Sequence, residues 1–376
     1  TSAHPVLDKR VFQRHALLLH NFGHEVILVA PNEKGTVQES GITIHGFPRA
    51  KTKAARLAQL PGIFRLARSL RGDVYHLHDP DLLAIGWRLR QSLGVPVVYD
   101  AHEDFSVQRN VAGISGRIGR FVSRMIGFGE KVLARRLDAV VCPHRIRLAE
   151  LQHPRKPGLF LPNYPPEDLF GTSTTVAESG RAVVYSGLLS KSRGAELILD
   201  AAEKMSDVRF ILLAKFMVAS EHEWFTSELK RRSAPNIDFR GFVPFEDMPA
   251  ELRRARAGIM PWLRTPQHVR AAQPSKLYEY MACGLPVVAA DLPITREIVA
   301  GNGCGLLHEP GNVDSFIEKT YAILNDPERA SEMGVKGIRA FRARYTYQTA
   351  GQELIDMYAF LVANNPHDKV GTVGSR

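Results

Sequence analysis

A short segment of the chain combines a helix start with a carboxylate about one turn further along. The segment 273–289 predicts a helix from Lys276 to Ala282, which Ser275 caps and Gly284 ends in a left-handed conformation. The N-terminus of a helix binds anions, because its backbone amides lack partners and its dipole is positive there. Glu279 is placed to accept hydrogen bonds from the two vicinal hydroxyls of a ribose. The pattern therefore predicts a nucleotide site, with a solvated helix face as the alternative. The residues expected to contact the nucleotide are Ser275, Lys276, Leu277 and Glu279.

A second segment, Ser186 to Gly194, places small residues at a strand end before a loop that enters a helix. Ser186 and Gly187 let backbone amides face a pyrophosphate, and Arg193 adds a cation that can pair with it. This pattern predicts phosphate binding. The alternative is that Lys191 and Arg193 are solvated loop charges.

Two histidines and two aspartates follow another strand, in the order His76-Leu77-His78-Asp79-Pro80-Asp81. Residues two apart on a strand share a face, so His76 and His78 have a spacing that can bind zinc, although the sequence shows no third ligand at a supporting distance. Asp79 and Asp81 form an Asp-x-Asp pair, a pattern that binds metal–nucleotide complexes in another fold. Because Pro80 favours the first turn of a helix, we predict helix capping there instead.

His102 follows the predicted strand from Val95 to Tyr99, at the carboxyl end where parallel sheets bind ligands. With Glu103 and Asp104 it forms an ionisable cluster that could orient an acceptor hydroxyl. A lone histidine is more often structural, so both interpretations of His102 stay open.

The elements that must position these residues alternate between strand and helix along the chain. Short runs rich in Val, Ile and Leu predict buried strands, and amphipathic stretches between them predict helices. The prolines between Pro154 and Ser179 predict a linker. The pattern therefore predicts two α/β domains with parallel sheets and helices on both faces. The predicted strands lie at 25–30, 73–77, 95–99 and 138–142, and then at 181–185, 208–213, 237–239, 257–260 and 286–290.

The composition is that of a two-domain globular protein of 376 residues. The net charge of +10 implies an anionic partner, and the absence of stacking aromatics among the basic residues argues against nucleic acid. No apolar run reaches the roughly 20 residues that span a bilayer. Cys142, Cys283 and Cys304 lack metal-ligand spacing, so buried packing in a reducing cytoplasm is predicted. The chain begins at Thr1 without Met or a signal-peptide pattern, which predicts a trimmed or internal sequence.

Residues 273–289 resemble the signature of family 4 of the retaining GT-B glycosyltransferases, also called glycosyl transferases group 1. The resemblance extends over nearly the whole chain, through 185–194, 236–244 and 292–299 to a closing helix at 345–361, and is to the branch of bacterial surface-polysaccharide transferases. It implies an α/β protein of the GT-B fold, with two Rossmann-like, doubly wound parallel-sheet domains facing across a cleft. The expected parts are an acceptor-side domain at 1–165 with its first strand largely missing, a nucleotide-sugar domain at 166–344, a helix at 345–364 that returns to the first domain, and a tail at 365–376.

The resemblance also implies roles for residues of the second domain. Glu279 would hold the nucleotide ribose. Arg193 and Lys215 would hold the diphosphate and, as catalytic residues, stabilise its departure together with helix amides. The family pattern has two glutamates separated by seven residues, and Ala271 stands where the first, which contacts the donor sugar, is expected. Other polar residues must then recognise the sugar, and the candidates are Gln273, Lys276 and His268.

In the first domain the resemblance implies contacts with the donor sugar and the acceptor. His102 would lie beside the donor sugar, with Glu103 next to it, and His102 is the candidate catalytic residue of this domain. The loop that carries His4 and Asp8 would approach the donor phosphates or the acceptor, although Asp8 and Arg10 could instead form a local ion pair. The strand end that carries His78 and Asp79 would line the acceptor side.

Together these observations predict a retaining glycosyltransferase that moves a sugar from a UDP- or GDP-sugar to a hydroxyl acceptor. The expected setting is the assembly of a bacterial cell-surface polysaccharide or glycolipid, with no cofactor, no required metal and no nucleic-acid partner. Three alternatives stay open: a natural-product transferase with a soluble acceptor, a sugar-nucleotide epimerase of similar fold, and a non-catalytic nucleotide-sugar-binding protein.

Two basic amphipathic stretches, 113–136 and 51–71, bear on the location of the acceptor. Such faces can rest on anionic lipid headgroups. They predict a cytoplasmic protein in peripheral contact with the inner face of the cell membrane, and a lipid-linked acceptor. Ordinary core-facing helices with a solvated rim are the alternative.

Overall fold

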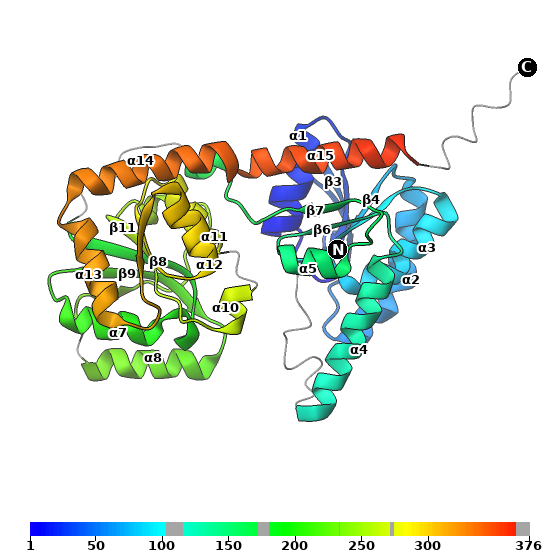
Figure 1. Cartoon of the computed structure of the whole chain (residues 1–376). Coiled ribbons are helices and arrows are strands. Elements are labelled where there is room, and N and C mark those ends of the chain that lie inside the picture. The colour runs from blue at the N-terminus through cyan, green and yellow to red at the C-terminus, as the bar shows by residue number, and fades with distance from the viewer. Residues whose placement is uncertain (103–115, 172–179, 233, 271–273, 366–376) are drawn as a thin grey trace, which may run out of the picture. The chain divides into compact units, whose positions relative to one another are not determined.

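The computed structural model describes residues 1–102, 116–171, 180–232, 234–270 and 274–365. The chain divides into two compact units (Figure 1). The first unit comprises Thr1–Asn163 and Ala350–Arg376, and the second comprises Tyr164–Thr349. Each is a mixed α/β structure built on parallel strands, as the alternation of strand and helix patterns predicted.

The described residues of the first unit form two sheets (Figure 1). One sheet is parallel throughout in the order β4-β5-β6-β7, and the other has the order β1-β3-β2, with β1 parallel and β2 antiparallel to β3. The antiparallel strand was not predicted. The strands are β1 (Ile27–Pro31), β2 (Thr36–Glu39), β3 (Ile42–Phe47), β4 (Tyr75–Leu77), β5 (Val97–Asp100), β6 (Ala139–Cys142) and β7 (Gly158–Phe160).

Strand β7 occupies part of the proline-rich range that predicted a linker, so that prediction is wrong for this part. β7 is the last strand of its sheet, and edge strands tolerate neighbouring prolines because one side of the backbone needs no partner. The division between the two units falls later, between Asn163 and Tyr164.

Helices pack on these two sheets and bury two apolar clusters, one on each sheet. They are η1 (Lys9–Ala16), which continues into α1 (Leu17–Asn21), then α2 (Lys53–Leu70), η2 (Pro80–Leu82), α3 (Leu83–Leu93), α4 (Gly116–Ala134) and α5 (Arg145–Leu151). The last helix, α15 (Tyr347–Ala363), belongs to this unit from Ala350 onward. It packs closely on α1, because a Cβ at Gly351 would lie only 2.6 Å from the side chain of Leu18.

The second unit has one parallel sheet in the order β10-β9-β8-β11-β12-β13 (Figure 1). The chain moves outward from β8 in one direction and then from β11 in the other, so the strand order reverses between β8 and β11. Ligands of open α/β sheets bind at such a switch point, beyond the carboxyl ends of the strands. The strands are β8 (Ala182–Leu189), β9 (Arg209–Phe216), β10 (Ile237–Phe239), β11 (Ala257–Met260), β12 (Val287–Ala290) and β13 (Gly305–His308).

Helices cover both faces of this sheet (Figure 1). Helices α7 and α13 bury apolar residues in one core together with β8, β9 and β11, while α11 packs against α14 on the opposite face. The helices are α6 (Glu167–Phe170), η4 (Lys191–Arg193), α7 (Ala195–Lys204), α8 (Ala219–Arg232), α9 (Met248–Leu252), α10 (Pro266–Arg270), α11 (Ser275–Ala282), α12 (Pro293–Thr295), η5 (Arg296–Ala300), α13 (Val313–Leu324) and α14 (Pro327–Arg344).

Two local details of the second unit test the helix signals. Gly284 has φ of +72°, which confirms the left-handed residue after α11. Ser275 does not cap this helix: it is the first helical residue, and Pro274 takes the capping position in an extended conformation. Proline has a fixed φ and no N–H, so it suits the residues just before a helix.

The three cysteines are buried, as predicted. None of the helices in the described ranges has both the length and the apolarity needed to cross a bilayer.

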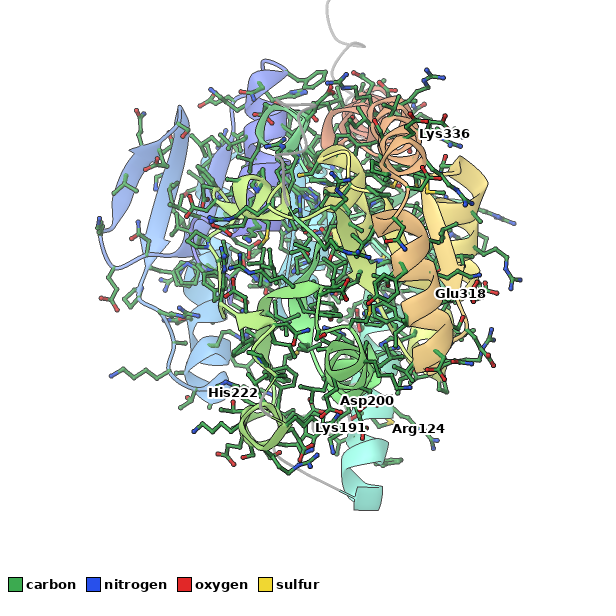
Figure 2. The ribbon with its side chains drawn as sticks, turned by 90° about the vertical axis from the view of Figure 1, so that its left-hand side faces the viewer. Arg124, Lys191, Asp200, His222, Glu318 and Lys336 are labelled. Atoms are coloured by element: carbon green, nitrogen blue, oxygen red, sulfur yellow. The ribbon has the colours of Figure 1, made fainter. Side chains whose placement is uncertain are left out.

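His308 provides a test of stability against pH. It ends β13 at 1% exposure, its ring lies against Phe316, and burial lowers its pKa from 6.5 to about 4. As the pH falls, His308 therefore takes up a proton in the unfolded chain before it does so in the folded chain. The contribution of His308 to the free energy of unfolding is fully present above about pH 6.5 and is lost as the pH falls toward 4. As the pH falls from 6.5 to 4, the free energy of unfolding of the wild type should decrease by about 2 to 3 kcal/mol more than that of His308→Gln. Urea unfolding at each pH measures this difference. The exposed His222, labelled in Figure 2, gives the control His222→Gln, which should track the wild type. Parallel pH profiles for wild type and His308→Gln would contradict this account.

Candidate functional site

The second unit brings its predicted residues together at the carboxyl ends of β8 and β9 and the start of α11. In the β8–β9 register Gly187 lies opposite Ala214, and Leu188 lies opposite Lys215. Lys276 comes from α11 and reaches the same place, since a Cβ built on Gly187 would be 3.8 Å from its Nζ atom. We call Gly187, Arg193, Lys276 and Glu279 the Lys276 cluster.

Lys276 has the least ordinary environment in this cluster. Its Nζ atom lies 3.5 Å from the centre of the Tyr185 ring and 5.9 Å from that of Trp262. The atom is buried and makes no hydrogen bond within the described part of the chain. Burial lowers the pKa of Lys276 well below its usual range, Arg193 lowers it further, and Glu279 raises it. A buried ammonium without a hydrogen-bond acceptor is energetically costly. A bound anion would accept its hydrogen bonds and favour the charged form of Lys276.

Gly187 leaves space beside this ammonium. Its φ of +94° is a conformation that L side chains rarely adopt, and a Cβ there would approach only the end of the Lys276 side chain. Ser186 and Gly187 were predicted to follow the strand, but β8 continues to Leu189, so both lie within it. Ser186 is buried, and its amide donates to the hydroxyl of Tyr280 at 2.9 Å. The side chain of Ser186 is therefore part of the packing, while Gly187 is open to solvent.

Arg193 lies on η4, which crosses from β8 toward the end of β11. The amide of Leu263 donates to Ser192 at 2.9 Å, and a Cβ on Gly194 would meet the carbonyl oxygen of Pro261 at 2.1 Å. The half-buried guanidinium of Arg193 donates to the carbonyl of Leu188 at 3.3 Å. Arg193 is thus fixed by backbone contacts at the switch point of the sheet.

The remaining cations differ in exposure. Lys215 is exposed at the end of β9, with Nζ 5.3 Å from the centre of the Phe242 ring. Lys191 is exposed too, and its Nζ lies 4.2 Å from the centre of the Trp224 ring (Figure 2 labels Lys191). His268 stacks on Trp262 with ring centres 4.5 Å apart, near Arg193 and Lys276. This places one of the three candidate polar substitutes for the missing glutamate beside the cluster.

Glu279 and its neighbours on α11 play different parts. Glu279 is half-buried in the fifth position of the helix, close enough to Lys276 to affect its pKa. Ser275 is half-buried at the first position. Leu277 is fully buried, and its amide donates to the carbonyl of Pro274, so it anchors the helix rather than offering a free group.

The first unit gathers its predicted residues around Asp100, the last residue of β5. The Nδ1 atom of His78 lies 3.1 Å, and that of His102 lies 3.3 Å, from one carboxylate oxygen of Asp100. The guanidinium of Arg10 binds both oxygens of Asp100 at 2.7 Å. Burial alone would raise the pKa of Asp100, but Arg10 and the imidazoles outweigh it and hold this pKa well below its usual range. We call this group the Asp100 cluster, and its members are Asp100, Arg10, His15, His76, His78 and His102.

Arg10 does not pair with Asp8, so the alternative of a local ion pair is wrong. Asp8 caps η1 by accepting from the amides of Arg10 and Val11, and its other oxygen lies 3.7 Å from Nδ1 of His4. Burial raises the pKa of Asp8, but the hydrogen bonds from His4 and the two amides lower it by more. The helix direction turns Arg10 away from Asp8 and into the core.

His4 connects this loop to the strand ends. Its Nε2 atom lies 3.0 Å from Nε2 of His102 and 3.4 Å from a carboxylate oxygen of Asp79. The other oxygen of Asp79 accepts from the amide of Ser2 at 2.7 Å. Asp79 occupies the capping position of η2, yet its side chain makes no capping hydrogen bond, so the prediction of side-chain capping is wrong. Pro80 does stand in the first turn, as predicted.

The sequence did not single out Asp100 or place Arg10 correctly, although both are central to the first unit. The available signal was a carboxylate at the end of a buried strand, which needs a nearby cation. Glu103, Asp104, Gln273 and Ala271 lie outside the described residues, so their predicted roles stay predictions.

Comparison with known proteins matches both units to glycosyltransferase family models. A family model described as "Glycosyl transferase 4-like domain" matches residues 9–156, and one described as "Glycosyl transferases group 1" matches residues 180–326. The D-inositol 3-phosphate glycosyltransferase of Segniliparus rotundus is 25% identical over 349 residues, which cover 85% of this chain and 75% of that protein. The phosphatidyl-myo-inositol mannosyltransferase of Mycolicibacterium smegmatis is 24% identical over 367 residues, covering 92% and 89%.

Among solved structures, Anabaena HepE in complex with UDP-glucose matches with a TM-score of 0.68 and 15% identity, covering 92% of this chain and 95% of that one. That likeness shows the GT-B fold, while the two family matches together cover most of the chain. The protein is therefore a glycosyltransferase enzyme that acts on sugar-nucleotide donors, and it belongs to the group 1 glycosyltransferases.

Proposed function

We propose that the protein transfers a sugar from a UDP- or GDP-sugar to a hydroxyl acceptor with retention of the anomeric configuration. The observation that carries the proposal is the buried ammonium of Lys276, which lacks a hydrogen-bond acceptor within the described residues and opens onto the space beside Gly187. The donor diphosphate would complete it, with Arg193 and Lys215 as further cations. HepE, which has the same fold, was solved with UDP-glucose, and this supports a UDP-sugar as the first donor to test.

Chemistry at this site would rest on charge. The bond from the sugar to the diphosphate breaks with negative charge developing on the departing phosphate. Lys276, Arg193 and the amides at the start of α11 stabilise that charge, and no metal is needed for it. Glu279 would accept hydrogen bonds from the ribose hydroxyls, and His102 with His4 would contact the sugar or the acceptor hydroxyl. Asp100 orients His102, because its carboxylate lies 3.3 Å from Nδ1.

The direct test is thermal unfolding with UDP, GDP, ADP and dTDP, with and without EDTA. A nucleotide that binds the folded state raises the melting temperature by mass action. Glu279→Ala should lose most of that shift for the preferred nucleotide, while the exposed Glu318→Ala should keep it (Figure 2 labels Glu318). Absence of a shift with every nucleotide would overturn the donor site, and a shift abolished by EDTA would overturn the metal-independent mechanism. NMR of the product's anomeric proton tests retention.

The acceptor is proposed to be lipid-linked, as the name of the mycobacterial phosphatidyl-myo-inositol mannosyltransferase supports. Helix α4 of the first unit carries several large exposed apolar side chains between Phe121 and Phe128, with Arg124 exposed among them (Figure 2). Apolar groups flanked by cations insert at the surface of anionic bilayers. The protein would then work in the cytoplasm at the inner face of the membrane. The exposed apolar residues are Phe121, Met125, Ile126 and Phe128.

Replacing the two aromatic residues of α4 tests this surface. Phe121→Ser with Phe128→Ser should weaken binding to phosphatidylglycerol vesicles by roughly 10- to 100-fold in sedimentation, because each ring loses part of the free energy of burial. Phe360 is exposed on α15 of the same unit, so Phe360→Ser is the matched control and should bind as the wild type does. Equal binding by the double variant and the wild type would remove α4 from the membrane surface.

A further inference from the structure

Four residues of the first unit converge at one point, and among them only Asp100 also serves the proposed transfer, by orienting His102. The imidazoles of His15, His76 and His78 and the carboxylate of Asp100 each offer one ligand atom, and these atoms all lie within 4.8 Å of one another. His15 comes from η1, His76 from β4, His78 from the residue after β4, and Asp100 from β5, so three elements meet at this point. The rings of His76 and His78 stack with centres 4.6 Å apart, and His15 lies 5.2 Å from each of them.

His76 is held as metal-binding histidines are held. Its Nδ1 atom lies 2.6 Å from the hydroxyl of Tyr358 on α15, while its Nε2 atom is buried without a hydrogen-bond partner in the described part of the chain. A ring whose one nitrogen is engaged by an outer partner presents the other nitrogen in a fixed direction. The buried Nε2 atom is a polar atom that a ligand would satisfy.

Asp100 has a similar outer partner. Arg10 binds both of its oxygens, and Arg10 is itself fixed by the carbonyl of Leu161 at 3.1 Å and the side chain of Asn163 at 2.7 Å. One carboxylate oxygen also faces His78 at 3.1 Å and His15 at 3.8 Å. That oxygen, Oδ2, also accepts from Nε of Arg10 at 2.7 Å, so the ion and the guanidinium would share it, while Oδ1 keeps its bond to Nη2 of Arg10.

The chemistry of this donor set favours one class of ligand. Imidazole nitrogen with a single carboxylate suits Zn²⁺ and neighbouring divalent transition metals rather than Mg²⁺ or Ca²⁺. Burial lowers the pKa values of all three histidines, which favours the neutral form of the ring that binds a metal ion. The thiols that could compete for zinc, Cys142, Cys283 and Cys304, are buried and free.

We propose that the first unit binds one Zn²⁺ ion, or a divalent transition metal of similar preference, through His15, His76, His78 and Asp100. The site shares no residue with the Lys276 cluster, which belongs to the second unit. It would fasten η1 to β4 and β5, and Tyr358 would extend that link to α15. The sequence pointed to His76 and His78 as a zinc pair but showed no third ligand.

Two features set the affinity. Zinc ligands lie about 2.0 to 2.2 Å from the ion, so tetrahedral ligand atoms are about 3.3 Å apart and this cluster must contract by an ångström or so. Arg10 places a second positive charge beside the ion, although the carboxylate between them screens it. Both features weaken binding relative to a dedicated structural zinc site, and we expect a dissociation constant of about 1 µM.

The test uses the full chain after dialysis against EDTA. Calorimetry with ZnCl₂, and visible absorption with CoCl₂, should show one equivalent bound, with the cobalt spectrum of an imidazole-ligated ion. His76→Gln should lower the zinc affinity at least about 100-fold, and Tyr358→Phe should lower it about 10-fold by freeing the ring. The exposed His24 gives the control His24→Gln, which should bind as the wild type does.

The outcomes separate this site from the proposed donor site. Tyr358→Phe keeps the ring packing, so it reports on the site even if His76→Gln unfolds. Absence of binding in the wild type, or equal affinity in wild type, His76→Gln and Tyr358→Phe, would overturn the metal site. Thermal shifts with nucleotides should be the same for wild type and Tyr358→Phe, because the donor residues lie in the second unit.

Discussion

Lys276→Met should bind the nucleoside diphosphate about 10- to 150-fold more weakly than the wild type, while the second unit stays at least as stable. A hydrogen bond from an ammonium to a phosphate contributes about 1.5 to 3 kcal/mol, which corresponds to that loss in affinity. Donor turnover should fall further, by about 100- to 1000-fold, because the same charge stabilises the departing diphosphate. Titration calorimetry with the preferred diphosphate and an assay of sugar transfer measure the two effects.

The stability of Lys276→Met distinguishes a role of the ammonium in binding from a role in packing. Met has nearly the volume of the Lys276 stem and keeps its contacts with Tyr185 but brings no charge into the core. The lost cation–π contact costs up to about 2 kcal/mol, and relief of the buried charge offsets it. We therefore expect a free energy of unfolding between unchanged and about 2 kcal/mol higher. A protein that needed Lys276 only for packing would show the opposite pattern: unchanged nucleotide affinity with lower stability.

Lys191→Met is the matched control for this experiment. Lys191 also lies over an aromatic ring, that of Trp224, but it is exposed to solvent. Lys191→Met removes one positive charge from the second unit, as Lys276→Met does, but leaves the Lys276 side chain beside Gly187 in place. Nucleotide affinity should change by less than about 3-fold, as is usual for exposed charges.

Arg10→Met should destabilise the first unit by about 3 to 5 kcal/mol, which corresponds to a melting temperature lower by about 6 to 20 °C. The loss is large because the variant leaves the fully buried carboxylate of Asp100 without its guanidinium. It also removes the donors to Leu161 and Asn163. Thermal unfolding by circular dichroism, with the transition of each unit resolved, measures the effect.

Two further variants show whether the buried charge is the cause. Adding Asp100→Asn to Arg10→Met removes the stranded charge and should restore about half of the lost stability. Arg56→Met breaks the more exposed ion pair with Asp81 and should cost no more than about 1 kcal/mol. A cost for Arg10→Met as small as that for Arg56→Met would show that Asp100 is satisfied by other groups.

The sequence predicted the second unit better than the first, for a physical reason. The signals around α11 are local: a proline, a periodic helix and a left-handed glycine within about three turns. The rule that ligands bind beyond parallel strand ends then places Arg193, Lys215 and Lys276 near one another without further information. The burial of Lys276 could not be predicted, because it depends on the ring of Tyr185 from β8 and the ring of Trp262 from the segment after β11.

The first unit depends on partners that are distant in sequence. Asp100 is 90 residues from Arg10, and His76 is 282 residues from Tyr358. Nothing in the sequence near Arg10 indicates which of many carboxylates it meets, so the nearest one, Asp8, was a reasonable but wrong alternative. The pairing follows only from how η1 packs on β5, which is a property of the whole topology.

Helix α15 gives the first unit a discontinuous sequence, and this bears on the order in which the protein folds as it is synthesised. The second unit, Tyr164–Thr349, is continuous and can fold once its last residue has left the ribosome. The first unit begins earlier but waits for Gly351 to cover Leu18 and for Tyr358 to reach His76. Domains usually mature in the order in which they are translated. Here the unit that starts first should finish last, so during translation its histidines and the apolar face of α1 are exposed to chaperones for the longest time.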